Sequence, residues 1–409
     1  MKLTRIASAI MAIAVLATAA SCTQKEEKAK YIFLFIGDGM GNSHVAVTES
    51  YLSWKEGKLG GEQLRMTTFP VFGTATSHSA NKRVTDSSAA GTAISCGEKT
   101  NNYSLGVDPE GNPVESMSYC LKADGYKVGI ISSVPINHAT PGAFYGHNVS
   151  RSAYYELIQE IPATGFEYFA SAGILEYNGP ARRGPQAAEA EPVQNAADFL
   201  EENGYDVCFG KAELATAMKE SEKIMFIQEY NKGVEPQNYD STGIKPESET
   251  TLAEMVQAGI DFLGDEEPFF IMCEGGEIDW AAHSDKTMPM VLATLGFDEA
   301  IETAYQFYLA HPDETLIVVT ADHETGGVSL GGAYGDVNWD VIEQSWIENN
   351  MSNNLSREDN AALNAKASIG WTTFNHTGGA VPVYAIGKGA EKFAGRIDNT
   401  DIKGKILGE

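Results

Sequence analysis

Residues 31–41 read YIFLFIGDGMG, an apolar run of six residues that ends in a glycine-flanked aspartate, Asp38. A strand that is apolar on both faces is typical of a parallel sheet covered by helices. Four more apolar runs of this kind lie at residues 127–134, 268–273, 315–320 and 381–386. Stretches with the periodicity of amphipathic helices lie between the runs, at residues 115–123, 151–160, 196–203, 250–263 and 289–309. We therefore predict an α/β fold, a three-layer sandwich whose mostly parallel central sheet is covered by helices on both faces.

Composition limits the class of protein. The chain has 409 residues, of which 43% are hydrophobic, and a formal net charge of −27 from 29 basic and 56 acidic residues. Its length allows one large domain with a sizeable core, which we place at residues 31–409, with polar insertions at residues 177–192 and 331–370. The acidity argues against nucleic acid as a specific partner and against a polybasic contact with anionic lipid, because both need clustered Lys and Arg.

The N-terminus has the layout of an export signal. Two basic residues precede an apolar run at residues 6–20, which is too short for a stable transmembrane helix. The run ends in Ala-Ala-Ser-Cys, which resembles a bacterial lipobox with Cys22 as the lipid-bearing residue. We expect a signal peptide at residues 1–21, a tether at residues 22–30, and an exported lipoprotein anchored to the cell envelope, periplasmic or surface-exposed. The alternative is an ordinary cleaved signal.

The other four cysteines are scattered along the chain as Cys96, Cys120, Cys208 and Cys273. They form no CxxC pair, which argues against a zinc–thiolate site. One or two disulfides could form outside the cytoplasm, and the sequence leaves their pairing open.

Clusters rich in Asp, Glu and His adjoin the apolar runs. They are residues 37–41 (GDGMG), 138–141 (HATP), 274–283 (EGGEIDWAAH), 321–327 (ADHETGG) and 375–379 (NHTGG). In open α/β sheets, ligands bind beyond the carboxyl ends of the strands. Carboxylates and imidazoles without thiolates suit zinc, and carboxylate with hydroxyl suits magnesium. A lone Asp there is usually a helix cap, but five clusters together predict a metal site at the carboxyl ends of the strands.

Spacing separates the candidate ligands from the other histidines. Asp279 and His283 are four residues apart, so a helical turn places both on one face. The histidines that lie in no such cluster receive no role: His44, His78, His147 and His311.

Residues 84–93 (VTDSSAAGTA) are small and predict the start of a helix. A serine at this position, such as Ser87, is most often an N-cap. The alternative is catalytic, because a helix N-terminus attracts phosphate through its free amides and dipole. Beside zinc ions, a serine hydroxyl can also ionise and act as a nucleophile.

Taken in order, the motifs IGDGMG, VTDSSAAGTA, HATP followed by Arg151, EGGEIDWAAH, TADHETGG and NHTGG resemble those of the alkaline phosphatase family. The resemblance extends from about residue 30 to the C-terminus. It implies hydrolysis of phosphate monoesters to an alcohol and inorganic phosphate at alkaline pH, through a phosphoserine intermediate on Ser87. It also implies two zinc ions and one magnesium ion in each active site, with small phosphomonoesters and inorganic phosphate as partners.

The resemblance assigns a role to each motif residue. Ser87 resembles the nucleophile, and Arg151 the guanidinium that holds two phosphate oxygens. The residues that resemble ligands of the first zinc ion are Asp279, His283 and His376. Those that resemble ligands of the second are Asp38, Asp322 and His323. Asp38 also bridges to the magnesium ion, whose site is completed by Thr140 and Glu274.

Two residues vary within the family. His138 stands where some members carry Asp near the magnesium ion, and Trp280 stands where others carry Lys or His near the phosphate. Both are candidates for the second shell of the site, and they leave open the third metal and the strength of product binding. The 331–370 insertion looks short for a crown-type element, which leaves a homodimer open.

The motifs fit three rival functions less well. Sulfatases carry a different Pro- and Arg-containing motif, and phosphodiesterases usually carry Thr at the nucleophile position and lack the Arg clamp. A binding protein without turnover would retain the metal ligands and lose Ser87 or Arg151, both of which are present.

Overall fold

The computed structural model describes residues 28–180, 193–228, 250–331, 336–349, 351 and 355–409. The predicted signal peptide, Cys22 and most of the predicted tether lie outside these residues. Within them, no helix has the length and apolar character needed to cross a membrane.

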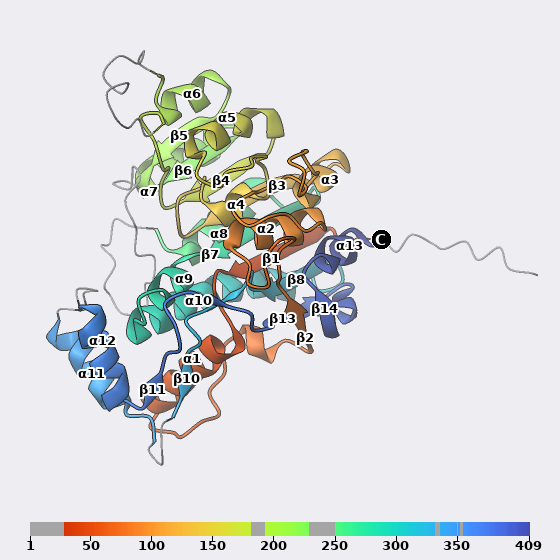
Figure 1. The fold of residues 1–409 in the computed structure, drawn as a ribbon. Helices are drawn as coiled ribbons and strands as arrows, with labels where there is room; N and C mark the ends of the chain where they lie inside the picture. The colour runs from red at the N-terminus through yellow and green to blue at the C-terminus, as the bar shows by residue number, and fades with distance from the viewer. Residues whose placement is uncertain (1–27, 181–192, 229–249, 332–335, 350, 352–354) are drawn as a thin grey trace, which may run out of the picture.

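A ten-stranded sheet runs across the molecule in the order β14-β2-β13-β8-β1-β7-β3-β4-β6-β5 (Figure 1). At its centre, β1 (Tyr31–Gly37) lies parallel to β7 (Phe269–Gly275) on one side and to β8 (Thr315–Thr320) on the other. Towards one edge, β13 (Val381–Gly387) is antiparallel to both β8 and β2 (Val71–Thr76). The sheet is therefore mostly parallel, as predicted.

All five predicted strands are present. Four of them are β1, β7, β8 and β13, and the other is β3 (Lys127–Ser132), which pairs with β7. The strands that sequence reasoning missed are β2, β4 (Tyr168–Ser171), β5 (Asp206–Phe209), β6 (Ile224–Ile227) and β14 (Gly395–Asp398). Four of these have four residues, too few to establish a periodicity. In β2 the residues are only alternately buried, so it lacks the continuous apolar run used to recognise the others.

Helices cover both faces of the sheet. Alternate side chains of β1 point to opposite faces, and Phe33 and Phe35 contact Phe307 and Phe297 of α10 (Thr287–Ala310). On the opposite face, Phe270 contacts Phe144, which follows α4. The other helices are α1 (Asn42–Lys55), α2 (Ser87–Cys96), α3 (Met117–Ala123), α4 (Ala139–Gly142), α5 (Tyr154–Thr164), α6 (Ala196–Glu202), α7 (Gly210–Glu220), α8 (Leu252–Leu263), α9 (Glu277–Ala282) and α13 (Asp401–Leu407), with short 3-10 turns at Met66–Thr68 and Ala390–Phe393.

The predicted insertion at residues 331–370 contains two helices, α11 (Trp339–Glu348) and α12 (Arg357–Lys366), which project from the sheet at the lower left of Figure 1. Two small antiparallel ladders flank it. One joins β10 (Ser329–Leu330) to β11 (Ile369–Gly370), and the other joins β9 (Glu324–Thr325) to β12 (His376–Thr377). The second ladder brings the ADHETGG and NHTGG motifs together.

The four cysteines in the described residues are all free, so none of the disulfides that the sequence left open forms among Cys96, Cys120, Cys208 and Cys273.

Candidate active site

Three neighbouring strands deliver three buried carboxylates to one edge of the sheet. Asp38 follows β1, Glu274 lies near the end of β7, and Asp322 follows β8. Ile36 is in register with Glu274 on one side and with Thr320 on the other, so the three side chains come to a similar level. Parallel pairing therefore creates the cluster that the sequence predicted.

Hydrogen bonds compensate only part of the burial of these carboxylates. Both carboxylate oxygens of Asp38, Oε1 of Glu274 and Oδ2 of Asp322 have no hydrogen-bond partner, and neither has Oγ1 of Thr140. Burial and the neighbouring carboxylates raise the pKa of Asp38 well above its usual value. Burial is also the main cause that raises the pKa of Glu274 to about 8 and that of Asp322 to about 7. Buried oxygens without donors fit a site for cations, which would reverse these shifts.

Side-chain donors converge in three groups whose ligand atoms lie within 4.8 Å of one another. The first is Asp279 with His283 and His376, as the resemblance implied. The second is Asp38 with Asp279 and His323, and Asp322 adjoins it, with Oδ2 lying 3.2 Å from Nε2 of His323. The third is Asp38 with His138 and Glu274, and Thr140 follows His138 in the first turn of α4.

The structure thus gives His138 a more direct position than the second shell that sequence reasoning assigned to it. Burial and the nearby Arg151 lower the pKa of His138 to about 3, so its imidazole is neutral and can donate a lone pair. The ring of Trp280 packs edge-on against it, with 5.7 Å between ring centroids.

The three histidines at the zinc-type groups are oriented in the same way. Nδ1 of His283 donates to the carbonyl of Phe374 (2.6 Å), and Nδ1 of His376 donates to the carbonyl of Thr85 (2.9 Å). Thr325 donates its hydroxyl hydrogen to Asp279 (2.5 Å), so its oxygen accepts from Nδ1 of His323 (3.2 Å).

Each Nε2 lone pair is consequently left facing the cluster, and Nε2 of His283 lies only 3.2 Å from Nε2 of His376. Two lone pairs at this distance repel each other unless a cation or a proton lies between them. Imidazoles fixed through Nδ1 are the usual arrangement of metal ligands. The residues therefore fit bound zinc.

Charges within the first group complement one another. Burial alone would raise the pKa of Asp279, but the nearby His283 and His323 hold it well below its usual value. Asp279 in turn raises the pKa of His283 to about 8, its Oδ2 lying 3.3 Å from Nε2.

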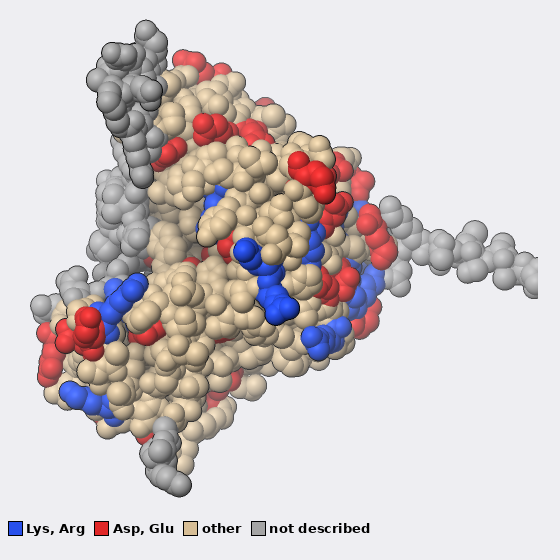
Figure 2. All heavy atoms as spheres, in the orientation of Figure 1, with Lys and Arg blue, Asp and Glu red and all other residues tan. Residues whose placement is uncertain are grey.

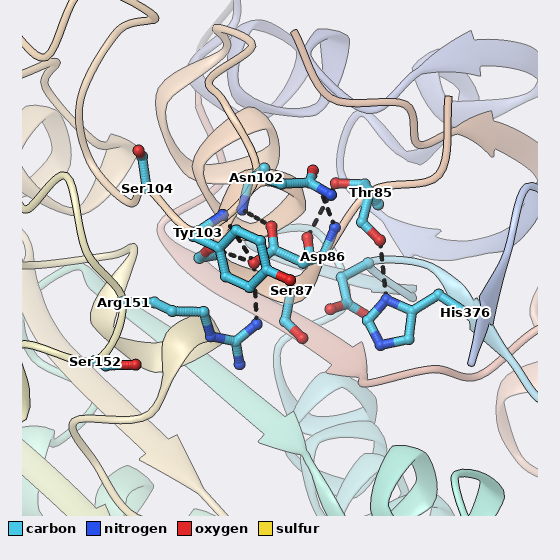
Figure 3. A network of polar contacts seen from close by, with 12 residues as sticks. Thr85, Asp86, Ser87, Asn102, Tyr103, Ser104, Arg151, Ser152 and His376 are labelled. Atoms are coloured by element: carbon cyan, nitrogen blue, oxygen red, sulfur yellow. Dashed lines mark hydrogen bonds and ion pairs between the residues drawn. The ribbon is translucent and has the colours of Figure 1, made fainter. Parts of the chain in front are cut away.

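Ser87 begins α2, and the residue that caps this helix is Asp86, whose Oδ1 accepts from the backbone of Ala89 (3.1 Å). The Ser87 hydroxyl is therefore not needed as a cap. It is almost fully buried, and its oxygen lies 3.2 Å from Nε2 of His323 (Figure 3). A candidate nucleophile thus touches a candidate metal ligand.

Arg151 approaches from the other side, and its guanidinium points towards Ser87 in Figure 3. Its Nη1 donates to Oδ2 of Asp86 (3.2 Å), and its Nη2 lies 3.4 Å from Nε2 of His138. The face between α4 and α9 is hollowed, and acidic side chains lie mainly along the outer edge of this view (Figure 2).

Sequence reasoning missed several residues of the site. Asp86 both caps α2 and holds Arg151, and its position beside Ser87 is the signal that could have identified it. Thr325 links Asp279 to His323, and Ser132 donates to Glu274. The contacts of Thr325 with Asp279 and of Ser132 with Glu274 join segments distant in sequence, so no local pattern predicts them.

The four histidines to which the sequence analysis assigned no role each lie near a carboxylate outside the three donor groups. Each has a ring nitrogen within 4 Å of a carboxylate oxygen, on Glu324, Asp398, Glu160 and Asp265 for His44, His78, His147 and His311 respectively. None belongs to the three donor groups. His44 is fully buried next to Glu324, its Nδ1 accepting from the backbone of Gly41, and it supports the loop after β1.

Comparisons with known proteins agree with this geometry. A family model described as alkaline phosphatase matches residues 29–176, 193–339 and 332–407. Alkaline phosphatase 4 of Bacillus subtilis is 28% identical over 433 residues, which cover 94% of this chain and 90% of that protein. Alkaline phosphatase of Escherichia coli is 25% identical over 92% of this chain and 85% of its own length.

Among solved structures, alkaline phosphatase from the Antarctic bacterium TAB5 superposes with a TM-score of 0.73 at 27% identity, over 93% of this chain and 97% of that one. A His-to-Asp variant of the TAB5 enzyme, with Mg bound in its M3 site, gives a TM-score of 0.72.

Proposed function

Because this chain belongs to the alkaline phosphatase family and hydrolyses phosphate monoesters, we propose that Ser87 is its nucleophile and that Arg151 binds the phosphoryl group. The observation that carries this assignment is the position of the Ser87 hydroxyl. Its oxygen adjoins His323 of the metal cluster on one side, and the Arg151 guanidinium lies on the other.

We further propose two zinc ions and one magnesium ion. The first zinc ion is held by Asp279, His283 and His376, and the second by Asp38, Asp322 and His323. The magnesium ion is held by Asp38, Thr140 and Glu274, with His138 adjoining. The unpartnered buried oxygens and the inward-facing Nε2 atoms support this arrangement. The third group differs from an all-oxygen magnesium site because it contains an imidazole, which suits zinc better than magnesium.

The metal ions supply Lewis-acid chemistry, lowering the pKa of bound hydroxyl groups and of water and offsetting charge on the phosphate. The chain's own residues hold the nucleophile and the phosphoryl group in position. Oγ of Ser87 attacks phosphorus, the alcohol leaves, and a phosphoserine remains for water to hydrolyse. Two phosphate oxygens accept hydrogen bonds from Arg151, whose planar guanidinium matches them. The free amides at the start of α2 favour the same negative charge.

Asp86 holds this arrangement together. Its Oδ2 accepts from Nη1 of Arg151 (3.2 Å), from the hydroxyl of Ser88 (2.8 Å) and from the backbone of Tyr103 (3.0 Å). One carboxylate thereby fixes the guanidinium relative to the helix that carries Ser87. It also limits the net charge that Arg151 presents, which favours release of phosphate.

Turnover distinguishes this function from its rivals. A purified enzyme should release phosphate from a chromogenic monoester much faster than from the matched diester or sulfate ester. A protein that binds phosphate without hydrolysing any of the three would contradict the proposal.

We also propose that the protein is exported and anchored through lipid on Cys22. The sequence motif supports this, and the fold is compatible with it. The described chain enters β1 at Tyr31, whereas Asp38 lies beyond the opposite end of that strand. An anchor before β1 would therefore leave the active site facing away from the membrane. A homodimer is a separate proposal, and the mass of the protein in solution tests it.

A further inference from the structure

Tyr103 has a backbone conformation that is unusual for a bulky residue. Its φ is 72°, in the left-handed region that glycine occupies readily and a tyrosine rarely does. Such strained residues cluster at functional sites, where the surrounding structure holds them in place.

Two hydrogen bonds hold Tyr103, and both involve the phosphate-binding residues. Its backbone N–H donates to Oδ2 of Asp86 (3.0 Å), the same oxygen that accepts from Arg151. Its carbonyl accepts from the backbone N–H of Arg151 (2.7 Å). Asn102 holds the same loop to the segment before Ser87, donating to the carbonyl of Val84 (3.2 Å). The backbone N–H and carbonyl of Tyr103 thus both form hydrogen bonds on the inner side of the loop.

Its side chain is directed outwards. The residue is 69% exposed, and the ring and hydroxyl make no hydrogen bond, ion pair or ring contact with any residue that the structure describes. In the view of Figure 3 the ring lies beside Ser87 and above the Arg151 guanidinium. Phe374, another exposed aromatic beside the site, differs because its ring packs against the Arg357 guanidinium at 4.4 Å.

We propose that the Tyr103 ring contacts the organic group of the substrate and gives the enzyme a preference for monoesters of planar, aromatic alcohols. This inference rests on the proposed function, which places the phosphoryl group between Ser87 and Arg151. Ser87 is buried and the Arg151 side chain is 17% exposed, so the rest of the ester extends towards solvent past the rim on which Tyr103 stands. An exposed ring held by a rigid loop stacks on a flat partner with little loss of entropy.

Two inhibitors that share a phosphonate head group test the proposal: phenylphosphonate and methylphosphonate. The measured quantity is the ratio of their competitive inhibition constants. Tyr103→Ala should lower the preference for the phenyl compound by about 3- to 10-fold, the range expected for loss of one aromatic contact. Tyr103→Phe should retain the preference, because the ring remains. Tyr103→Gly should behave like Tyr103→Ala while relieving the backbone strain.

Phe72→Ala is the matched control, since it removes an exposed aromatic ring of β2 that packs on Tyr384 and adjoins no site residue described above. It should leave the ratio unchanged. An unchanged ratio in Tyr103→Ala would overturn the proposal. So would an equal weakening of both inhibitors, which would show that Tyr103 acts only by holding Asp86 and Arg151. Absence of monoester turnover in the unmodified enzyme would instead contradict the proposed function itself.

Discussion

The hydroxyl oxygen of Ser87 lies 3.2 Å from Nε2 of His323, although the two residues are 236 positions apart in the chain. Ser87 is fixed by the start of α2, and His323 by the end of β8 and by Thr325. The contact forms because the N-terminus of a helix on one face of the sheet reaches the edge where the central strands end. It places the proposed nucleophile between the donor groups of Asp and His and the Arg151 guanidinium.

Metal content is the first prediction. The purified enzyme should contain two zinc ions and one magnesium ion per chain by elemental analysis, because side-chain donors converge in three groups and buried oxygens of Asp38, Glu274 and Asp322 have no hydrogen-bond partner. Exhaustive chelation should abolish activity and lower the melting temperature, and zinc with magnesium should restore both. Full activity of a metal-free preparation would contradict the assignment.

Stability of the metal-free protein should fall as the pH rises from about 6.5 to 8, above the range in which the lowered pKa values of the buried His44 and His138 act in the opposite direction. Glu274 and Asp322 have raised pKa values of about 8 and about 7, and His283 has a raised pKa of about 8. A raised pKa means that the folded state binds more protons than the unfolded state in this range, so deprotonation favours unfolding. The expected result is a melting temperature of the chelated protein that decreases between these pH values.

Glu274→Gln provides the control for this effect. It removes one of the titrating groups and should flatten the pH dependence of the chelated protein. Zinc and magnesium should also abolish the dependence in the unmodified protein, because bound cations favour the ionised carboxylates. A chelated protein that grows more stable across this range would refute the explanation.

Arg151→Ala should lower kcat/KM for monoesters by about 10- to 150-fold, since charge-assisted hydrogen bonds contribute roughly 1.5–3 kcal/mol. Inorganic phosphate should also inhibit this variant less.

Asp86→Ala should have a different effect on stability and on phosphate binding. It removes the N-cap of α2 and should destabilise the fold by about 1 kcal/mol, while the freed guanidinium binds phosphate more tightly. Thermal unfolding and phosphate inhibition measure the two effects separately, and equal phosphate affinities in both variants would contradict these roles.

Cys22→Ser tests the anchor. If lipid on Cys22 holds the protein at the envelope, the unmodified protein should fractionate with membranes and dissolve in detergent. The variant should remain unprocessed or appear in the soluble fraction. Substitution of Cys120, which is free in the structure, should leave fractionation unchanged. An unmodified protein found only in the soluble fraction would exclude the anchor.

Much of this arrangement could be predicted from sequence because the chemistry lies at strand ends. Asp38 and Asp322 directly follow continuous apolar runs, and parallel pairing makes such residues converge. Asp86 was missed because an Asp before a helix is accounted for by capping alone, and its second contact, with Arg151, lies 65 residues away. Motif position gave no distance for His138, which the structure brings together with Asp38 and Glu274 in the third group.

The two helices of the insertion were overlooked for a different reason. Residues 331–370 were predicted only as a polar insertion, with no secondary structure assigned to them. Asn338 and Ser356 cap α11 and α12, and Ser356 is followed three residues later by Asp359, whose N–H it accepts. Those capping signals were present in the sequence. The apolar face of α11 is short, however, and its partner, α10, is recognisable only in three dimensions.

Trapping of the phosphoenzyme tests the central claim most directly. Enzyme incubated with labelled phosphate and quenched in acid should carry the label on the peptide that contains Ser87. Ser87→Ala should lose the label and most of its turnover, keeping only a residual rate from water activated in the same pocket. Ser95→Ala, the same substitution within α2, should retain both label and turnover. Label on another residue, or near-normal turnover in Ser87→Ala, would contradict the account.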